Sequence, residues 1–114
     1  MSPRVGVGLV ALQRLERAVD RRGAVLLERT FSPGEVAYCE SQRSPLLHYA
    51  ARLAARRAAL SAGIRPASPL WAALVRVLSD MRATGGIDPA CGLSVSLSHE
   101  SDTALAFLSW WTET

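Results

Sequence analysis

The sequence contains no lysine and no asparagine, and all 13 of its basic residues are arginine. Abundant alanine and leucine accompany this bias, which is typical of a GC-rich genome. The bias still has a chemical consequence, because lysine supplies the flexible point charge of many phosphate sites, whereas arginine presents a planar fork. Phosphate sites of the lysine type are therefore excluded.

Long apolar runs and cysteine are also scarce. No run approaches the roughly 18 residues that cross a bilayer, and Arg4 is followed by no signal-peptide core. Cys39 and Cys91 are too few for a disulfide scaffold, and they lack the spacing of a CxxC motif. We therefore expect neither a membrane nor a secreted protein, and a reduced, cytoplasmic setting is favoured.

The length of 114 residues suits one domain over 1–114. A chain of this size buries only about two-thirds of the surface of its unfolded state. We therefore expect no large active-site cavity enclosed by one copy, and a site shared between copies is an alternative.

The net charge of +3 would suit nucleic acid, but its distribution does not. The arginines are scattered among ten acidic residues, and no basic stripe is interleaved with the few aromatic residues. We rank an anionic small molecule or an acidic protein partner above nucleic acid.

Hydrophobic patterning predicts the elements of the first half of the chain. The apolar, glycine-containing run 5–10 is typical of a buried strand with close backbone approach at its glycines. A helix follows over 13–22. Ser32, Pro33 and Glu35 predict a capped helix start with a capping box. A further helix over 45–62 carries a stripe of apolar and small residues, and this stripe includes Arg57.

The second half predicts mainly strands. Residues 72–78 suit either a strand or a short helix, and 82–92 is rich in turn residues. Residues 93–98 and 103–111 alternate with period two and predict an antiparallel hairpin. The predicted class is α+β, with helices packed on a small, mainly antiparallel sheet.

Four segments, in order along the chain, resemble motifs of the holo-acyl-carrier-protein synthases, the small trimeric branch of the 4′-phosphopantetheinyl transferases. The family motifs are Gly-x-Asp-Ile-Val-x-Ile, Phe-Thr-x-x-Glu-x-x-Tyr-Cys, Ala-Arg-Phe-Ala-Ala-Lys-Glu-Ala and Val-Ser-Leu-Ser-His-Asp/Glu. The matching segments are Gly6-Val7-Gly8-Leu9-Val10-Ala11-Leu12, Phe31-Ser32-Pro33-Gly34-Glu35-Val36-Ala37-Tyr38-Cys39, Ala51-Arg52-Leu53-Ala54-Ala55-Arg56-Arg57-Ala58 and Val95-Ser96-Leu97-Ser98-His99-Glu100. The resemblance implies this family's fold and a homotrimer with sites between protomers.

The chain departs from the family where the resemblance implies a magnesium site. The family's Asp and Glu, which hold the ion against the diphosphate of coenzyme A, correspond to Gly8 and Arg57. Magnesium requires hard oxygen ligands, so we expect no metal and no resident cofactor, while coenzyme A remains a ligand that the resemblance implies. A further helix lysine, which in the family meets the coenzyme A phosphate, is also replaced, by Ser61, and the Gly-Lys-Pro segment before residue 95 has no counterpart.

The resemblance also implies roles for the retained polar residues. His99 and Glu100 match the pair that assists coenzyme A binding and deprotonation of the carrier serine, and a histidine suits acid–base work. Alternatively, His99 only closes the hairpin. Glu35 is a third catalytic candidate, although capping explains it fully.

Six further residues are candidates for binding anions or an acidic partner. Arg57, with Arg56 and Ser98, is a candidate anion or substrate group, or else Arg57 pairs with Glu35 or Glu100 and closes the old site. Three other arginines share one face of the first predicted helix, and we expect them to contact an acyl carrier protein. They are Arg14, Arg17 and Arg21.

Three functions follow, in this order. The first is a carrier-protein-binding member in fatty-acid or polyketide assembly that has lost magnesium-dependent transfer. The second is a metal-independent acid–base enzyme (an isomerase, dehydratase or cyclase) for a carrier-bound acyl or polyketide substrate at the subunit interface. The third is phosphopantetheinyl transfer that survives with Arg57 in place of the ion. Catalysis itself is left open.

Overall fold

The computed structural model describes residues 2–112, with side chains described as far as Trp111. No helix within this range is long and apolar enough to cross a membrane. In chain order the elements are β1 (Ser2–Ala11), α1 (Leu12–Arg22), α2 (Ala24–Thr30), α3 (Pro33–Glu40), α4 (Pro45–Ser61), α5 (Pro69–Asp80), β2 (Gly85–Asp88), β3 (Leu93–Glu100) and β4 (Thr103–Thr112).

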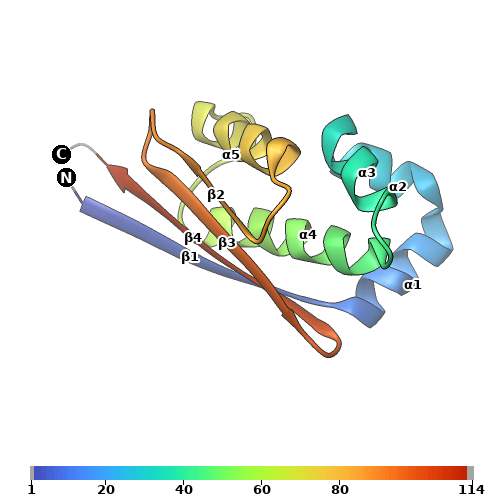
Figure 1. Cartoon of the computed structure of the whole chain (residues 1–114). Coiled ribbons are helices and arrows are strands. Elements are labelled where there is room, and N and C mark those ends of the chain that lie inside the picture. The colour runs from blue at the N-terminus through green and yellow to red at the C-terminus, as the bar shows by residue number, and fades with distance from the viewer. Residues whose placement is uncertain (1, 113–114) are drawn as a thin grey trace.

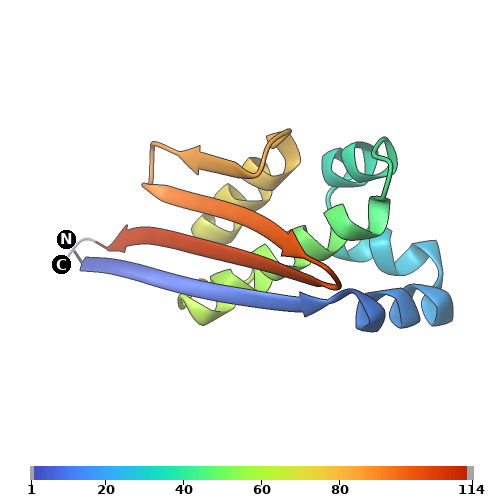
Figure 2. The ribbon, with the colours of Figure 1, turned by 60° about the horizontal axis from the view of Figure 1, so that its bottom comes forward.

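The four strands form one antiparallel sheet in the order β1-β4-β3-β2, seen side by side in Figure 2. The predicted hairpin is confirmed as β3 and β4, joined through Ser101 and Asp102. Sequence patterning missed β2, because its four residues begin with two glycines and lie within a turn-rich stretch. The α+β class with a mainly antiparallel sheet is therefore confirmed.

Helices α4 and α5 cover one face of the sheet, and α1 to α3 lie beyond the end where β1 leads into α1 (Figures 1 and 2). Helix α4 packs on β1 at very short range. A Cβ atom built on Gly6 would lie 1.9 Å from the carbonyl oxygen of Ala58, and one on Gly8 would lie 1.9 Å from that of Ala54. The predicted close approach at these glycines is confirmed, since only hydrogen fits there.

Residues 69–80 form a helix, which settles the alternative left open for 72–78. The hydroxyl of Ser68 accepts a hydrogen bond of 3.1 Å from the backbone N–H of Trp71, and Pro69 occupies the first turn. Leu74 and Leu78, four residues apart, are both completely buried in the core. A strand would also place these two leucines on one face, so their burial agrees with the helix without deciding between the alternatives.

The sheet face turned away from α4 and α5 is exposed and apolar. Along β1 the exposed side chains alternate with the buried ones, and Phe107 and Trp111 of β4 are each about half exposed. Trp110 instead faces the helices, and its Nε1 donates a hydrogen bond of 3.3 Å to the carbonyl of Ala62. The open face of β1 carries Val5, Val7 and Leu9. This face is a large apolar surface, which commonly marks an interface.

Candidate functional site

Glu35 is fully buried, with both carboxylate oxygens occupied. The predicted capping box is confirmed: the backbone N–H of Ser32 donates to Glu35 Oε1 at 3.0 Å, and that of Glu35 donates to the Ser32 hydroxyl at 3.2 Å. Arg56 then donates to Oε2 at 2.8 Å and to Oε1 at 2.5 Å. This bidentate pair joins the start of α3 to the middle of α4, so both residues have a structural role. Neither carboxylate oxygen of Glu35 is left free to bind a ligand.

The alternative in which Arg57 pairs with Glu35 or Glu100 is not seen: Arg56 holds Glu35 instead, and Arg57 forms no ion pair within the described residues. The predicted position of Arg57 on the buried stripe of α4 is also wrong, since Arg57 is exposed and Arg56 is buried. Neighbouring positions on a helix point about 100° apart, so burying Arg56 turns Arg57 towards the edge of the sheet.

The Nη1 of Arg57 donates a hydrogen bond of 2.9 Å to the carbonyl of Leu9 on the edge strand β1. Its cationic head is thereby fixed beside Gly8, where the resemblance places two carboxylates around a metal ion. Gly8 lies against α4 without room for a side chain. No cluster of three or more potential metal ligands occurs within the described residues. The residues present therefore do not fit a magnesium site.

His99 and Ser98 border a hollow of about 180 Å³ that is rich in basic side chains. Its floor is apolar and includes Leu97 and Ala51, and its described lining contains no carboxylate. Arg52, Arg82 and His48 contribute the other basic groups. Glu100, at the exposed end of β3, does not line the hollow. The predicted pair of His99 and Glu100 is therefore split between the hollow and the hairpin end.

Tyr38 organises the cations of this hollow. The guanidinium carbons of Arg52 and Arg82 lie 4.7 and 5.0 Å from the centre of its ring, and His48 meets the ring edge-on at 5.6 Å. A tyrosine ring attracts cations through its quadrupole and holds them in place. The arrangement concentrates positive charge at a partly enclosed surface, which suits an anion.

The charge of Arg52 is partly balanced within the fold, whereas that of His48 is opposed. Arg52 Nη2 donates to the carbonyl of Met81 at 3.1 Å, and its buried Nε has no hydrogen-bond partner but forms an ion pair with Glu35 Oε2 at 3.9 Å. The pKa of His48 is lowered below its usual 6.5 by burial, then by Arg52 and His99. An anion placed here would offset the repulsion between His48 and these cations.

Sequence reasoning assigned no role to Arg52, Tyr38, Arg82 or His48. A usable signal existed for Arg52, which precedes Arg56 by four residues and so shares its face of α4. Two arginines on the buried face of one helix require buried acceptors, and both approach Glu35. Arg82 and His48 have no such signal, because only the fold brings them beside Tyr38.

The predicted carrier-binding arginines Arg14, Arg17 and Arg21 are all exposed on α1. Arg14 and Arg21 line a second hollow together with Arg57, whereas Arg17 does not. Seven residues make almost two helical turns, so Arg14 and Arg21 lie above one another, while Arg17 lies about 60° to one side on the same exposed face.

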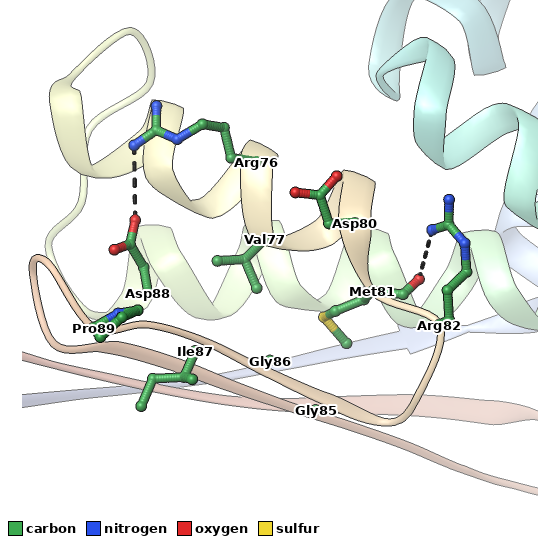
Figure 3. Close-up of a pocket in the computed structure, with 10 residues that line it drawn as sticks. All are labelled: Arg76, Val77, Asp80, Met81, Arg82, Gly85, Gly86, Ile87, Asp88 and Pro89. Carbon is green, nitrogen blue, oxygen red and sulfur yellow. Dashed lines mark hydrogen bonds and ion pairs between the residues drawn. The ribbon is translucent and has the colours of Figure 1, made fainter.

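A third hollow, of about 420 Å³, lies between α5 and β2 (Figure 3). Arg76 faces Asp88 at 3.7 Å, and Asp80 and Arg82 add one charge of each sign. Because the signs balance, this surface has no preference for an anion or a cation.

Comparison with known proteins relates this geometry to a family. No family model matches the chain. A holo-[acyl-carrier-protein] synthase of Chlorobium phaeovibrioides is 33% identical over 90% of this chain and 89% of its own length. One of Desulforudis audaxviator is 36% identical over 90% of this chain and 88% of its own.

Solved structures share the fold. The crystal structure of holo-[acyl-carrier-protein] synthase from Neisseria meningitidis has a TM-score of 0.70 and 22% identity, covering 96% of this chain and 98% of its own. The synthase–coenzyme A complex from Chronobacterium ammoniagenes has a TM-score of 0.69 and 23% identity over all of both chains. The fold is therefore that of the acyl-carrier-protein synthases. At the identities of the curated relatives, the chain belongs to the holo-[acyl-carrier-protein] synthase family.

Proposed function

We propose that this chain binds an acyl carrier protein in fatty-acid or polyketide-type assembly and has lost conventional magnesium-dependent phosphopantetheinyl transfer. The observation that supports this most strongly is the contact of Arg57 with the carbonyl of Leu9, beside a glycine that has no room for a side chain. A cation stands where the family resemblance places a metal ligand, and the second ligand position is filled by the backbone of α4.

Carrier binding rests on the exposed arginines of α1. The curated relatives are named for acting on an acyl carrier protein, and we propose that Arg14, Arg17 and Arg21 contact an acidic surface of such a partner. Charge complementarity of this kind raises the association rate and selects the partner.

We also propose coenzyme A as a small-molecule ligand, because one structural relative is a complex with it. The basic hollow beside His99 is the surface that suits one of its phosphate groups, and Arg52, Arg82 and His99 would hold it. Such a site depends on charge-assisted hydrogen bonds and not on a metal.

The acid–base enzyme ranks second. His99 borders a hollow, which an enzyme of this kind requires, but no carboxylate lines the described part of that hollow. Glu35 is buried and bound by Arg56. The carboxylates suggested as catalytic partners of His99 are therefore outside the described lining of this hollow. Residual transfer through Arg57 ranks third.

We propose a homotrimer in the cytoplasm. The exposed apolar face of β1 and β4 supports self-association, because burying it removes apolar area from water. Both cysteines are free, which agrees with a reducing compartment. Light scattering tests the assembly, and a monodisperse monomer would contradict it.

Titration calorimetry with an acyl carrier protein tests the proposed binding. We expect Arg14→Glu to weaken binding about tenfold or more, because reversing a charge adds repulsion to the lost attraction. Arg65→Glu, an equal charge reversal at an exposed loop position remote from α1, is the matched control. Equal effects of the two variants would contradict an interface on α1.

A further inference from the structure

The hollow that Arg14, Arg21 and Arg57 share is lined by more arginines than either of the other two hollows described above. It measures about 320 Å³ and lies where α1, α2 and α4 meet the end of β1. Its described lining contains three arginines and no acidic residue. Its apolar lining includes Val10, Leu15, Leu26, Phe31 and Leu53. The hollow therefore combines an apolar floor with a cationic rim.

The three guanidinium groups have donors to spare. Arg57 uses its Nη1 for the carbonyl of Leu9, and a guanidinium carries five N–H donors. Among the residues that the structure describes, Arg14, Arg21 and Arg57 form no ion pair. The contact with Leu9 also restricts Arg57, so less side-chain entropy is lost when it binds a ligand.

The ligand that suits this surface is an anion joined to a less polar chain. A planar guanidinium fork matches the oxygens of a phosphate in bidentate fashion, and several forks around one group give selectivity that a single surface charge does not. A neutral hydroxyl gains little from such a rim. The lining of the hollow therefore favours a phosphorylated partner over an unmodified one.

We infer that this hollow recognises the phosphodiester and arm of a carrier protein that already carries 4′-phosphopantetheine. This inference rests on the proposed function, because it names the form of the carrier that is bound. The unmodified carrier presents a serine hydroxyl, and the modified carrier presents an anionic phosphodiester with the pantetheine arm behind it. Arg57 then meets the phosphodiester while the arm or its acyl group lies on the apolar floor.

The inference places the chain after the modification step. A phosphopantetheinyl transfer, carried out by another enzyme, must supply the modified carrier. This chain would then retain or present the modified carrier and would not consume the unmodified one. No bond is made or broken in this step, and no metal is required.

Calorimetry with matched unmodified, modified and acylated carrier protein, in the presence of a chelator, tests the inference. We expect the modified carrier to bind about tenfold more tightly than the unmodified one, as one charge-assisted contact provides. Arg57→Gln should bring the ratio of the two affinities close to one, whereas Arg65→Gln should leave it unchanged. Thermal melts of both variants check that they fold.

The outcomes separate the two proposals. Equal affinity for unmodified and modified carrier overturns the preference but leaves carrier binding intact. Failure to bind any form contradicts the proposed function and, with it, the inference. Free 4′-phosphopantetheine and decanoate serve as competitors. Competition by phosphopantetheine that Arg57→Gln abolishes supports the phosphodiester assignment. Competition by decanoate alone overturns it in favour of an acyl carboxylate.

Discussion

The guanidinium of Arg57 donates to the carbonyl of Leu9 at 2.9 Å, and this contact joins α4 to the edge strand directly after Gly8. A carboxylate at position 57 would repel that carbonyl and would need a cation between the two. The same pair of segments, β1 and α4, can thus hold a metal ion or an arginine, but not both. In this chain the arginine and the close packing of Gly8 reinforce one another.

Gly8→Ala tests the packing of β1 on α4. The added methyl group would lie 1.9 Å from the carbonyl oxygen of Ala54, so either the strand or the helix must move. We expect a loss of about 3 kcal/mol in the free energy of unfolding, at the upper end of ordinary overpacking. Gly85→Ala is the control, because a Cβ there approaches only the carbonyl oxygen of Val95, at 3.3 Å. Equal urea-denaturation curves for parent and Gly8→Ala would contradict the described packing.

Arg56→Ala should destabilise the fold far more than Arg57→Ala. Removing Arg56 leaves the carboxylate of Glu35 fully buried without its bidentate partner, and breaking a buried pair in this way costs about 3–5 kcal/mol. Arg57 is exposed, so its loss should cost less than about 1 kcal/mol. Denaturant unfolding of both variants measures the difference, and similar losses would argue against the pair as the join between α3 and α4.

The lowered pKa of His48 predicts a dependence of stability on pH. Below pH 6.5 the unfolded chain takes up a proton at His48 before the folded chain does, because burial, Arg52 and His99 oppose its charge. The free energy of unfolding should therefore fall as the pH drops below 6.5, and this part of the loss ends below the folded-state pKa. His48→Gln should have a shallower pH dependence. Parallel curves for parent and variant would contradict this assignment.

An anion in the hollow beside His99 should weaken that pH effect. Sulfate bound near Arg52 offsets the repulsion that lowers the pKa of His48, so its binding should tighten as the pH falls through 6.5. Sulfate is used because its own charge does not change in this pH range. Thermal shift with sulfate at several pH values measures this linkage, with chloride at matched ionic strength as the control. A sulfate effect that is independent of pH would exclude His48 from the site.

Cys39 should react slowly with thiol reagents. Burial raises its pKa to about 11, so little thiolate forms at neutral pH, and its side chain is not exposed. Cys91 is only half-buried and should react first with dithionitrobenzoate. In the Cys91→Ser variant, the fast phase of the reaction with dithionitrobenzoate should disappear, and the slow phase from Cys39 should remain. Rapid labelling of Cys39 in the folded protein would contradict its place in the core.

Much of the fold could be predicted because local signals agreed with one another. The capping residues of α3, the glycines of β1 and the alternation of β3 and β4 each specify an element, and all four were correct. Helix α5 was ambiguous, because Leu74 and Leu78 fall on one face both in a strand of period two and in a helix of period 3.6. Only packing on the sheet distinguishes the two.

The sites were less accessible to sequence reasoning. Whether Arg56 or Arg57 faces the core depends on how α4 is rotated about its own axis. A prediction that is wrong by one residue, or about 100°, exchanges the buried and the exposed arginine. The hollow beside His99 depends on three elements that meet at Tyr38, far apart along the chain. The basic residues could be listed from the sequence, but the place where the fold brings them together could not be predicted.

Mass spectrometry of an unmodified acyl carrier protein, incubated with this protein, coenzyme A and magnesium, tests the central claim most directly. A family member with an intact metal site serves as the positive control. We predict no phosphopantetheine mass increment on the carrier with this chain, while calorimetry under the same conditions detects the complex. A magnesium-dependent increment that is lost in a chelator would contradict the account.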